Sequence, residues 1–106
     1  MSISVVATIK VKDDEDIGVV GRVLGQFSRR APEEGAIRYE VILNEPTFYV
    51  IEVWPDRTTL KNHLTTPEFQ KGLDEEIVPR LDGSVEKPLD VQIHEGEELT
   101  LQDVIG

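Results

Sequence analysis

The chain has 106 residues, no cysteine and a formal net charge of −10, which comes from 21 acidic and 11 basic side chains. A chain of this length is expected to form one domain with one core, and the lack of cysteine excludes disulfides, thiolate nucleophiles and sulfur-ligated zinc. Such an acidic surface repels phosphate backbones and anionic lipids, and the apolar runs are too short to cross a bilayer, so neither nucleic acid nor membrane is an expected partner. Because the N-terminus also lacks the pattern of a signal peptide, we expect a cytoplasmic protein.

The first third of the chain predicts a strand followed by an amphipathic helix. Residues 3–11 alternate between a clearly apolar face and a mixed face, which is typical of a half-buried strand. The acidic run 13–16 favours a helix start, since carboxylates stabilise the positive end of the helix dipole. Apolar residues then recur at helical spacing from Ile17 to Ala31, and the helix is expected to end before Pro32.

Three glycines of this predicted helix, Gly18, Gly21 and Gly25, share one flank. Each costs about 1 kcal/mol relative to alanine in a helix interior, so some other contact should offset the loss. Two explanations stay open: close packing of the helix backbone on the sheet, or a ligand pocket widened by the missing side chains.

Two strands are predicted in the middle of the chain, over residues 37–43 and 48–54. The turn residues 44–47 between them indicate an antiparallel hairpin. The second of these strands is largely apolar on both faces, with Glu52 as its one charged residue. This pattern implies that both faces of the sheet are covered at that strand.

Two short helices and a last strand follow the hairpin. Asp56 and Thr66 are good N-caps for the two helices, and the second helix is expected to continue until Pro79 disturbs it. Residues 89–93 alternate again and predict the last strand.

The order strand, helix, strand, strand, helices, strand is the split βαβ pattern. It predicts an α+β fold, a ferredoxin-like βαββαβ domain with an antiparallel sheet, over residues 1–94. Helices would cover one face of the sheet, and a second copy of the chain would cover the open apolar face, giving a homodimer. Residues 95–106 form an acidic tail whose apolar residues are expected to serve as a dimer-contact arm.

Residues 5–12, 35–40 and 49–54, followed by the His63-Leu64 pair, match a known pattern. Together these segments resemble the antibiotic biosynthesis monooxygenase family over roughly residues 3–94. The resemblance implies that the ferredoxin-like chain pairs into a dimeric α/β barrel. The segment that runs from the third strand to His63 is its most specific part.

Family members of known activity are mostly cofactor-free oxygenases of anthrone- or quinol-like aromatics, in which the substrate anion itself reacts with O₂. The resemblance therefore implies an apolar pocket with a polar group that deprotonates or orients the substrate, and neither cofactor nor metal. The two histidines, His63 and His94, are also too far apart in sequence for the usual zinc spacing. Glu68 stands where the family often has a second histidine. Ala7 and His63 replace the asparagine and tryptophan of the haem-degrading branch, so that activity is not expected.

His63 is the expected base or hydrogen-bond partner of the substrate, because an imidazole exchanges a proton near neutral pH. Glu52 lies among apolar neighbours, so it needs a partner such as His63, Arg38 or a capping N–H, and we expect it to orient His63. The side chains expected to bind the substrate are Trp54, Phe69, Tyr39, Phe27 and Arg38. Packing in the core remains the alternative for the aromatic residues, and a structural hydrogen bond remains the alternative for His63.

The sequence thus predicts a small cofactor-independent monooxygenase that uses O₂ and a quinol- or anthrone-like substrate, with His63 and Glu52 as catalytic residues. Two alternatives stay open. The protein could be a non-catalytic dimeric module of the same fold that binds a small apolar ligand or a partner, or a small-molecule isomerase that uses the same pocket.

Overall fold

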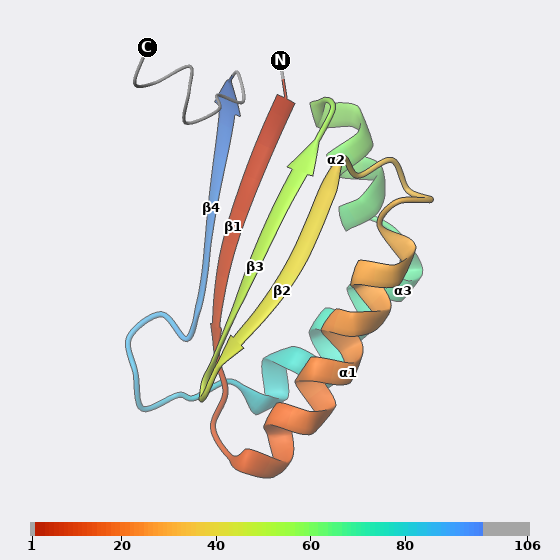
Figure 1. Cartoon of the computed structure of the whole chain (residues 1–106). Coiled ribbons are helices and arrows are strands. Elements are labelled where there is room, and N and C mark those ends of the chain that lie inside the picture. Colours follow the sequence, from red (N-terminus) through yellow and green to blue (C-terminus); the bar gives the residue numbers. More distant parts are fainter. Residues whose placement is uncertain (1, 97–106) are drawn as a thin grey trace.

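The computed structural model describes residues 2–96 of the chain (Figure 1). Its elements are β1 (Ser2–Lys10), α1 (Asp14–Arg30), β2 (Arg38–Asn44), β3 (Thr47–Trp54), α2 (Arg57–Leu64), α3 (Pro67–Lys71), η1 (Gly72–Ile77), η2 (Val78–Arg80) and β4 (Leu89–Gly96). This order confirms the predicted ferredoxin-like α+β fold. Strand β4 reaches Gly96, two residues into the segment predicted as a tail, and the rest of that segment lies outside the described residues.

The four strands form one antiparallel sheet in the order β2-β3-β1-β4. The register places Val5 of β1 opposite Glu52 of β3 on one side and opposite Ile93 of β4 on the other. These side chains therefore share one face of the sheet, because residues that lie directly opposite in a ladder point the same way. The helices pack against this face and leave the other face open (Figure 1).

The helices begin and pack as their sequences dictate. The apolar stripe of α1, which includes Val20, Leu24 and Phe27, is buried against the sheet. The Asp56 side chain caps α2 by accepting from the Thr59 backbone N–H at 2.8 Å, and the Thr66 hydroxyl caps α3 in the same way. Both caps were predicted, because a cap depends only on residues within one turn.

The segment after α3 is not the regular helix that its apolar spacing predicts. The chain widens into the π-helix η1 and then tightens into the 3₁₀-helix η2, which contains Pro79. The change of pitch begins at Gly72, where the backbone lies so near α1 that a Cβ atom would be 2.7 Å from the Phe27 ring. Such π segments often occur at functional sites.

The open face of the sheet carries an apolar patch made of Val6, Ile42 and Tyr49, all of which are exposed. Ile42 and Tyr49 lie directly opposite each other in the β2–β3 ladder, and Tyr49 lies opposite Thr8 in the β3–β1 ladder. We call these three residues the open-face patch. A contiguous exposed apolar patch on a sheet is a common sign of a contact surface.

The three glycines of α1 do not share one explanation. A Cβ atom on Gly21 would be in ordinary contact with the Phe48 ring at 3.4 Å, whereas one on Gly18 would meet no atom within 4 Å. Close packing, one of the two explanations left open for the α1 glycines, is tighter at Gly72 than at any of them. This contact depends on how η1 packs against α1. The spacing of residues along α1 does not reveal that packing.

Replacing Gly72 by alanine should destabilise the protein by about 1–2 kcal/mol, because a new methyl group must displace the buried Phe27 ring. The matched change Gly18→Ala, in open space on α1, should instead stabilise it by up to about 1 kcal/mol through helix propensity. Urea unfolding of both variants measures the two free energies. Equal stabilities for the two variants would show that the contact between η1 and α1 is not tight.

Candidate functional site

A cavity of about 110 Å³ lies between the sheet and the helices. Every strand and every helix from α1 to η1 contributes to its wall. The lining residues are Val5, Ala7, Ile9, Leu24, Phe27, Tyr39, Val50, Glu52, Leu64, Phe69, Leu73, Ile77, Leu89 and Val91. Only Glu52 and Tyr39 are polar among them, so the cavity is an apolar space with one carboxyl and one phenol group.

Glu52 is a buried carboxyl, with 6% of its surface exposed. Its Oε1 atom accepts a hydrogen bond from Trp54 Nε1 at 2.9 Å. Burial raises the pKa of Glu52 above its ordinary value, because a desolvated carboxylate is disfavoured, and the Trp54 N–H and the charge of His63 only partly oppose this rise. The hydrogen-bond donor of Glu52 is therefore Trp54, which the sequence did not single out for this role, whereas His63, one of the expected partners, acts on Glu52 through its charge.

Tyr39 lies opposite Glu52 in the β2–β3 ladder, so the two polar groups of the cavity are neighbours on one face. Burial raises the pKa of the Tyr39 hydroxyl above its ordinary value, and the negative charges of Glu52 and Glu34 raise it further. The phenol therefore stays protonated at neutral pH and can donate a hydrogen bond.

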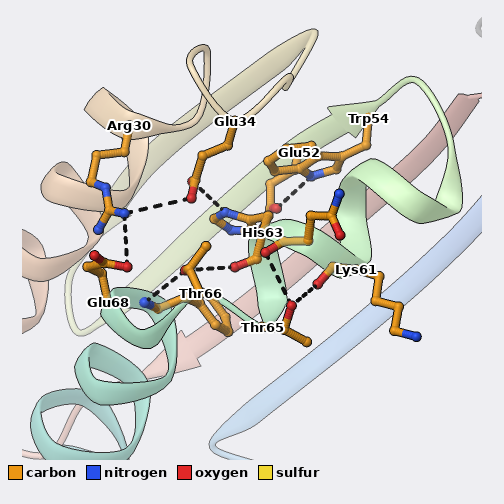
Figure 2. A network of polar contacts seen from close by, with 11 residues as sticks. Arg30, Glu34, Glu52, Trp54, Lys61, His63, Thr65, Thr66 and Glu68 are labelled. Carbon is orange, nitrogen blue, oxygen red and sulfur yellow. Dashed lines mark hydrogen bonds and ion pairs between the residues drawn. The ribbon is translucent and has the colours of Figure 1, made fainter.

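His63 lies next to the cavity and is almost fully enclosed, with 1% of its surface exposed. Its ring stacks on the Trp54 indole at 4.6 Å between centroids and contacts the Phe69 ring at 4.9 Å. His63 Nδ1 donates to Glu34 Oε1 at 2.8 Å, since a carboxylate can only accept (Figure 2). Within residues 2–96, the buried Nε2 atom has no hydrogen-bond partner.

Glu34 is the site residue that the sequence did not identify. It lies in the turn after α1, where Gly35 adopts a φ of +100° that favours glycine. Figure 2 shows Glu34 at one end of a chain of ion pairs, in which Arg30 approaches Glu34 at 3.8 Å and Glu68 at 3.2 Å. Glu68, the residue that departs from the family pattern, thus pairs with Arg30 outside the cavity.

The structure brings together most of the residues that the sequence selected. Tyr39, Glu52, Phe27 and Phe69 line the cavity. Trp54 and His63 lie behind Glu52 and are not part of the lining, although the sequence placed Trp54 in the wall.

Arg38 does not join the other predicted substrate-binding residues. Because Tyr39 faces the cavity, the neighbouring Arg38 points to the opposite face of the sheet. There its guanidinium pairs with Glu40 at 2.8 Å. Alternation along β2 already contained this information, since two successive residues of a strand cannot both reach one pocket.

Two further observations concern metal ions and membranes. Over the described range 2–96, no group of three or more His, Asp or Glu side chains is arranged to hold a metal ion. None of the helices in the same range is both long enough and apolar enough to cross a membrane.

The fold and the site define a class: a ferredoxin-like domain with an apolar cavity under its helices and a single carboxyl group in the cavity wall. The family model described as antibiotic biosynthesis monooxygenase matches residues 2–75. The chain therefore belongs to the antibiotic biosynthesis monooxygenase family, as the resemblance predicted.

Solved structures of similar fold agree with this assignment. Rv0793 from Mycobacterium tuberculosis has a TM-score of 0.78 at 13% identity, covering 93% of this chain and 98% of that one. A putative antibiotic biosynthesis monooxygenase from Caulobacter crescentus has a TM-score of 0.76 at 20% identity, covering 92% and 91%. A conserved protein from Methanosarcina mazei Go1 has a TM-score of 0.72 at 25% identity, covering 92% and 94%. No curated protein matches the chain.

The Glu52→Gln variant should gain stability relative to the wild type as the pH rises. Because the folded-state pKa is raised, the stability contributed by the protonated carboxyl is present below the ordinary value of 4.5 and is lost as the pH rises through the raised pKa. Glutamine can still accept from Trp54 but cannot ionise. Each unit of raised pKa contributes about 1.4 kcal/mol to the difference between variant and wild type at neutral pH.

Urea unfolding of both proteins from pH 4 to pH 8 measures this difference. Glu40→Gln is the matched control, because a hydrogen bond from Arg38 lowers the pKa of the exposed Glu40 carboxyl. The effect of that variant should have the opposite sign. A difference between Glu52→Gln and wild type that does not change with pH would contradict the burial of an ionisable carboxyl in the cavity.

Proposed function

We propose that the protein is a small cofactor-independent monooxygenase that holds a single-ring hydroquinone in the cavity. The observation that carries the proposal is the apolar cavity whose wall contains one carboxyl of raised pKa, Glu52. Membership of the antibiotic biosynthesis monooxygenase family supports the reaction class.

The volume of the cavity favours one aromatic ring. An apolar cavity of roughly 150 Å³ is known to hold benzene, and drug-sized ligands occupy pockets of roughly 300–1,000 Å³. At about 110 Å³ the cavity is near the size of one ring. An anthrone, with three fused rings, would require the helices to move away from the sheet. Of the two substrate classes predicted from sequence, the quinol type is therefore the better fit.

Glu52 is the group that we assign as general base. A phenolic hydroxyl in the cavity would lie against this carboxyl, and a raised pKa makes a carboxylate a stronger base. The protonated Tyr39 hydroxyl beside it can donate a hydrogen bond to the substrate oxygen. The resulting substrate anion would transfer electrons to O₂, so that one oxygen atom enters the ring and the other leaves as water with two hydrogens of the substrate.

His63 acts in this proposal as a positioning residue and not as the base. Its ring stacks on Trp54, whose Nε1–H holds the Glu52 carboxyl, and Glu34 fixes the orientation of the ring. The charge of a protonated His63 also favours the carboxylate form of Glu52.

Oxygen uptake with a panel of hydroquinones and anthrones tests this function. The wild type should consume O₂ with hydroquinones without added flavin, haem or metal, and Glu52→Gln should lower the rate by at least about 100-fold, the usual contribution of a general base. His63→Gln should lower it less. Glu40→Gln, on the opposite face of the same sheet, should leave the rate unchanged.

If His63→Gln lowers the rate of O₂ uptake more than Glu52→Gln does, His63 and not Glu52 is the base. Failure of the wild type to consume O₂ with any compound of the panel would contradict the oxygenase proposal. Binding without turnover would then favour a non-catalytic module, and conversion without O₂ would favour an isomerase.

We also propose that two copies of the chain pack through their open faces to form a dimeric α/β barrel. The open-face patch supplies exposed apolar surface on the side of the sheet that no helix of residues 2–96 covers. Burying such surface contributes roughly 25 cal/mol per Å² to association.

Sedimentation at low concentration should give a species of twice the 11.9 kDa chain mass. Tyr49→Glu, which places a charge in the open-face patch, should shift the equilibrium toward monomer because a buried unpaired charge is strongly disfavoured. Val78→Glu, at an exposed apolar residue of η2, should not shift it. A wild-type monomer at all concentrations would contradict the dimer.

A further inference from the structure

A second hollow, a groove of about 460 Å³, lies between α2 and the end of β4. Its lining combines apolar side chains with polar side chains. The lining residues are Ile3, Arg57, Leu60, Lys61, Leu64, Thr65, Gln70, Ile93 and Glu95. Neither the family assignment nor the proposed reaction gives this groove a role.

The groove continues the cavity along the same face of the sheet. Leu64 lines both of them. In β4, Val91 of the cavity and Ile93 of the groove are two residues apart and point the same way, and Val5 of the cavity lies opposite Ile93 in the ladder. A molecule that occupies the cavity can therefore extend past Leu64 over β1 and β4.

The apolar side chains of β4 on this face are unusually exposed. Val91 and Ile93 keep 49% and 55% of their surface exposed, although Val5 and Ala7, beside them on β1, are buried. Figure 1 shows β4 at the edge of the sheet that lies farthest from α1, which leaves its side chains less covered. An apolar strip that begins at the mouth of a cavity is suited to an apolar ligand segment.

Two of the polar side chains of the groove are hydrogen-bonded to other parts of the chain. Arg57 Nε donates to Glu95 Oε2 at 2.8 Å, which links α2 to β4. Gln70 Nε2 donates to the Leu64 carbonyl at 2.6 Å. With these groups paired, the apolar surface that remains for a ligand comes mainly from Leu64 and the exposed Ile93, while Ile3 and Leu60 form the buried floor beneath them.

We propose that this groove is a second subsite, which binds an apolar side chain carried by the ring in the cavity. The proposal deepens the proposed function, on which it rests for the identity of the ring. It names the substrate class as a single-ring hydroquinone with an alkyl or alkenyl substituent. The unsubstituted ring would occupy the cavity alone.

Calorimetry under nitrogen with the full chain tests the proposal, using hydroquinone and n-hexylhydroquinone as probes. Each methylene group that becomes buried strengthens binding by up to about fourfold, so the hexyl compound should bind at least about 30-fold more tightly. Ile93→Asp should reduce the affinity for the hexyl compound at least tenfold and leave hydroquinone within about twofold. Ile37→Asp, an equally exposed isoleucine that lines neither the cavity nor the groove, should change neither affinity.

Equal affinities for the two probes, or an equal loss of both in Ile93→Asp, would overturn the subsite. A gain that appears only in a chain ending at Gly96 would also overturn it, because it would assign the groove to residues 97–106. Turnover is measured separately. A gain in affinity without O₂ uptake contradicts only the proposed function, whereas O₂ uptake without the gain contradicts only the subsite.

Discussion

The site depends on one buried hydrogen bond, from the Trp54 indole N–H to the Glu52 carboxyl. A carboxyl in an apolar cavity is strongly disfavoured unless a donor satisfies it. Trp54 can supply that donor only if its indole is held in place, and the stacked His63 ring holds it. His63 is in turn held by Glu34. Four side chains from β3, α2 and the turn after α1 thus form one connected unit behind the cavity.

In the proposed function, this unit would link catalysis to the stability of the fold. Burial that raises the pKa of Glu52 makes the ionised form of this carboxyl unfavourable in the folded chain. A general base needs such a raised pKa, and active sites are places where proteins retain unfavourable burial of this kind. The ion pair between Arg30 and Glu68 outside the cavity is partly exposed, and contributes far less to stability.

The uneven cover of the sheet decides the shape of the ligand space. Helix α1 and the α3–η1 segment pack on one face of the sheet and enclose a cavity of about 110 Å³ beneath them. Strand β4 lies at the edge of the sheet, and its apolar side chains remain exposed beside α2. The space proposed for a ring and the groove proposed for its substituent both follow from this arrangement.

The sequence by itself determined the order of the elements, the inward faces of the strands and the caps of α2 and α3, because periodicity and capping act over a few residues. It also indicated the family, through the match of several short segments. It also identified Tyr39, Glu52, Phe27 and Phe69, which the fold gathers around the cavity. Only the tertiary structure decided that Glu34 holds His63, a contact across 29 positions in the chain. It also decided that Glu52 and not His63 reaches the cavity, and that Gly72, more closely than any glycine of α1, lies against a neighbour. These outcomes depend on how helices sit on the sheet, and no local pattern encodes that placement.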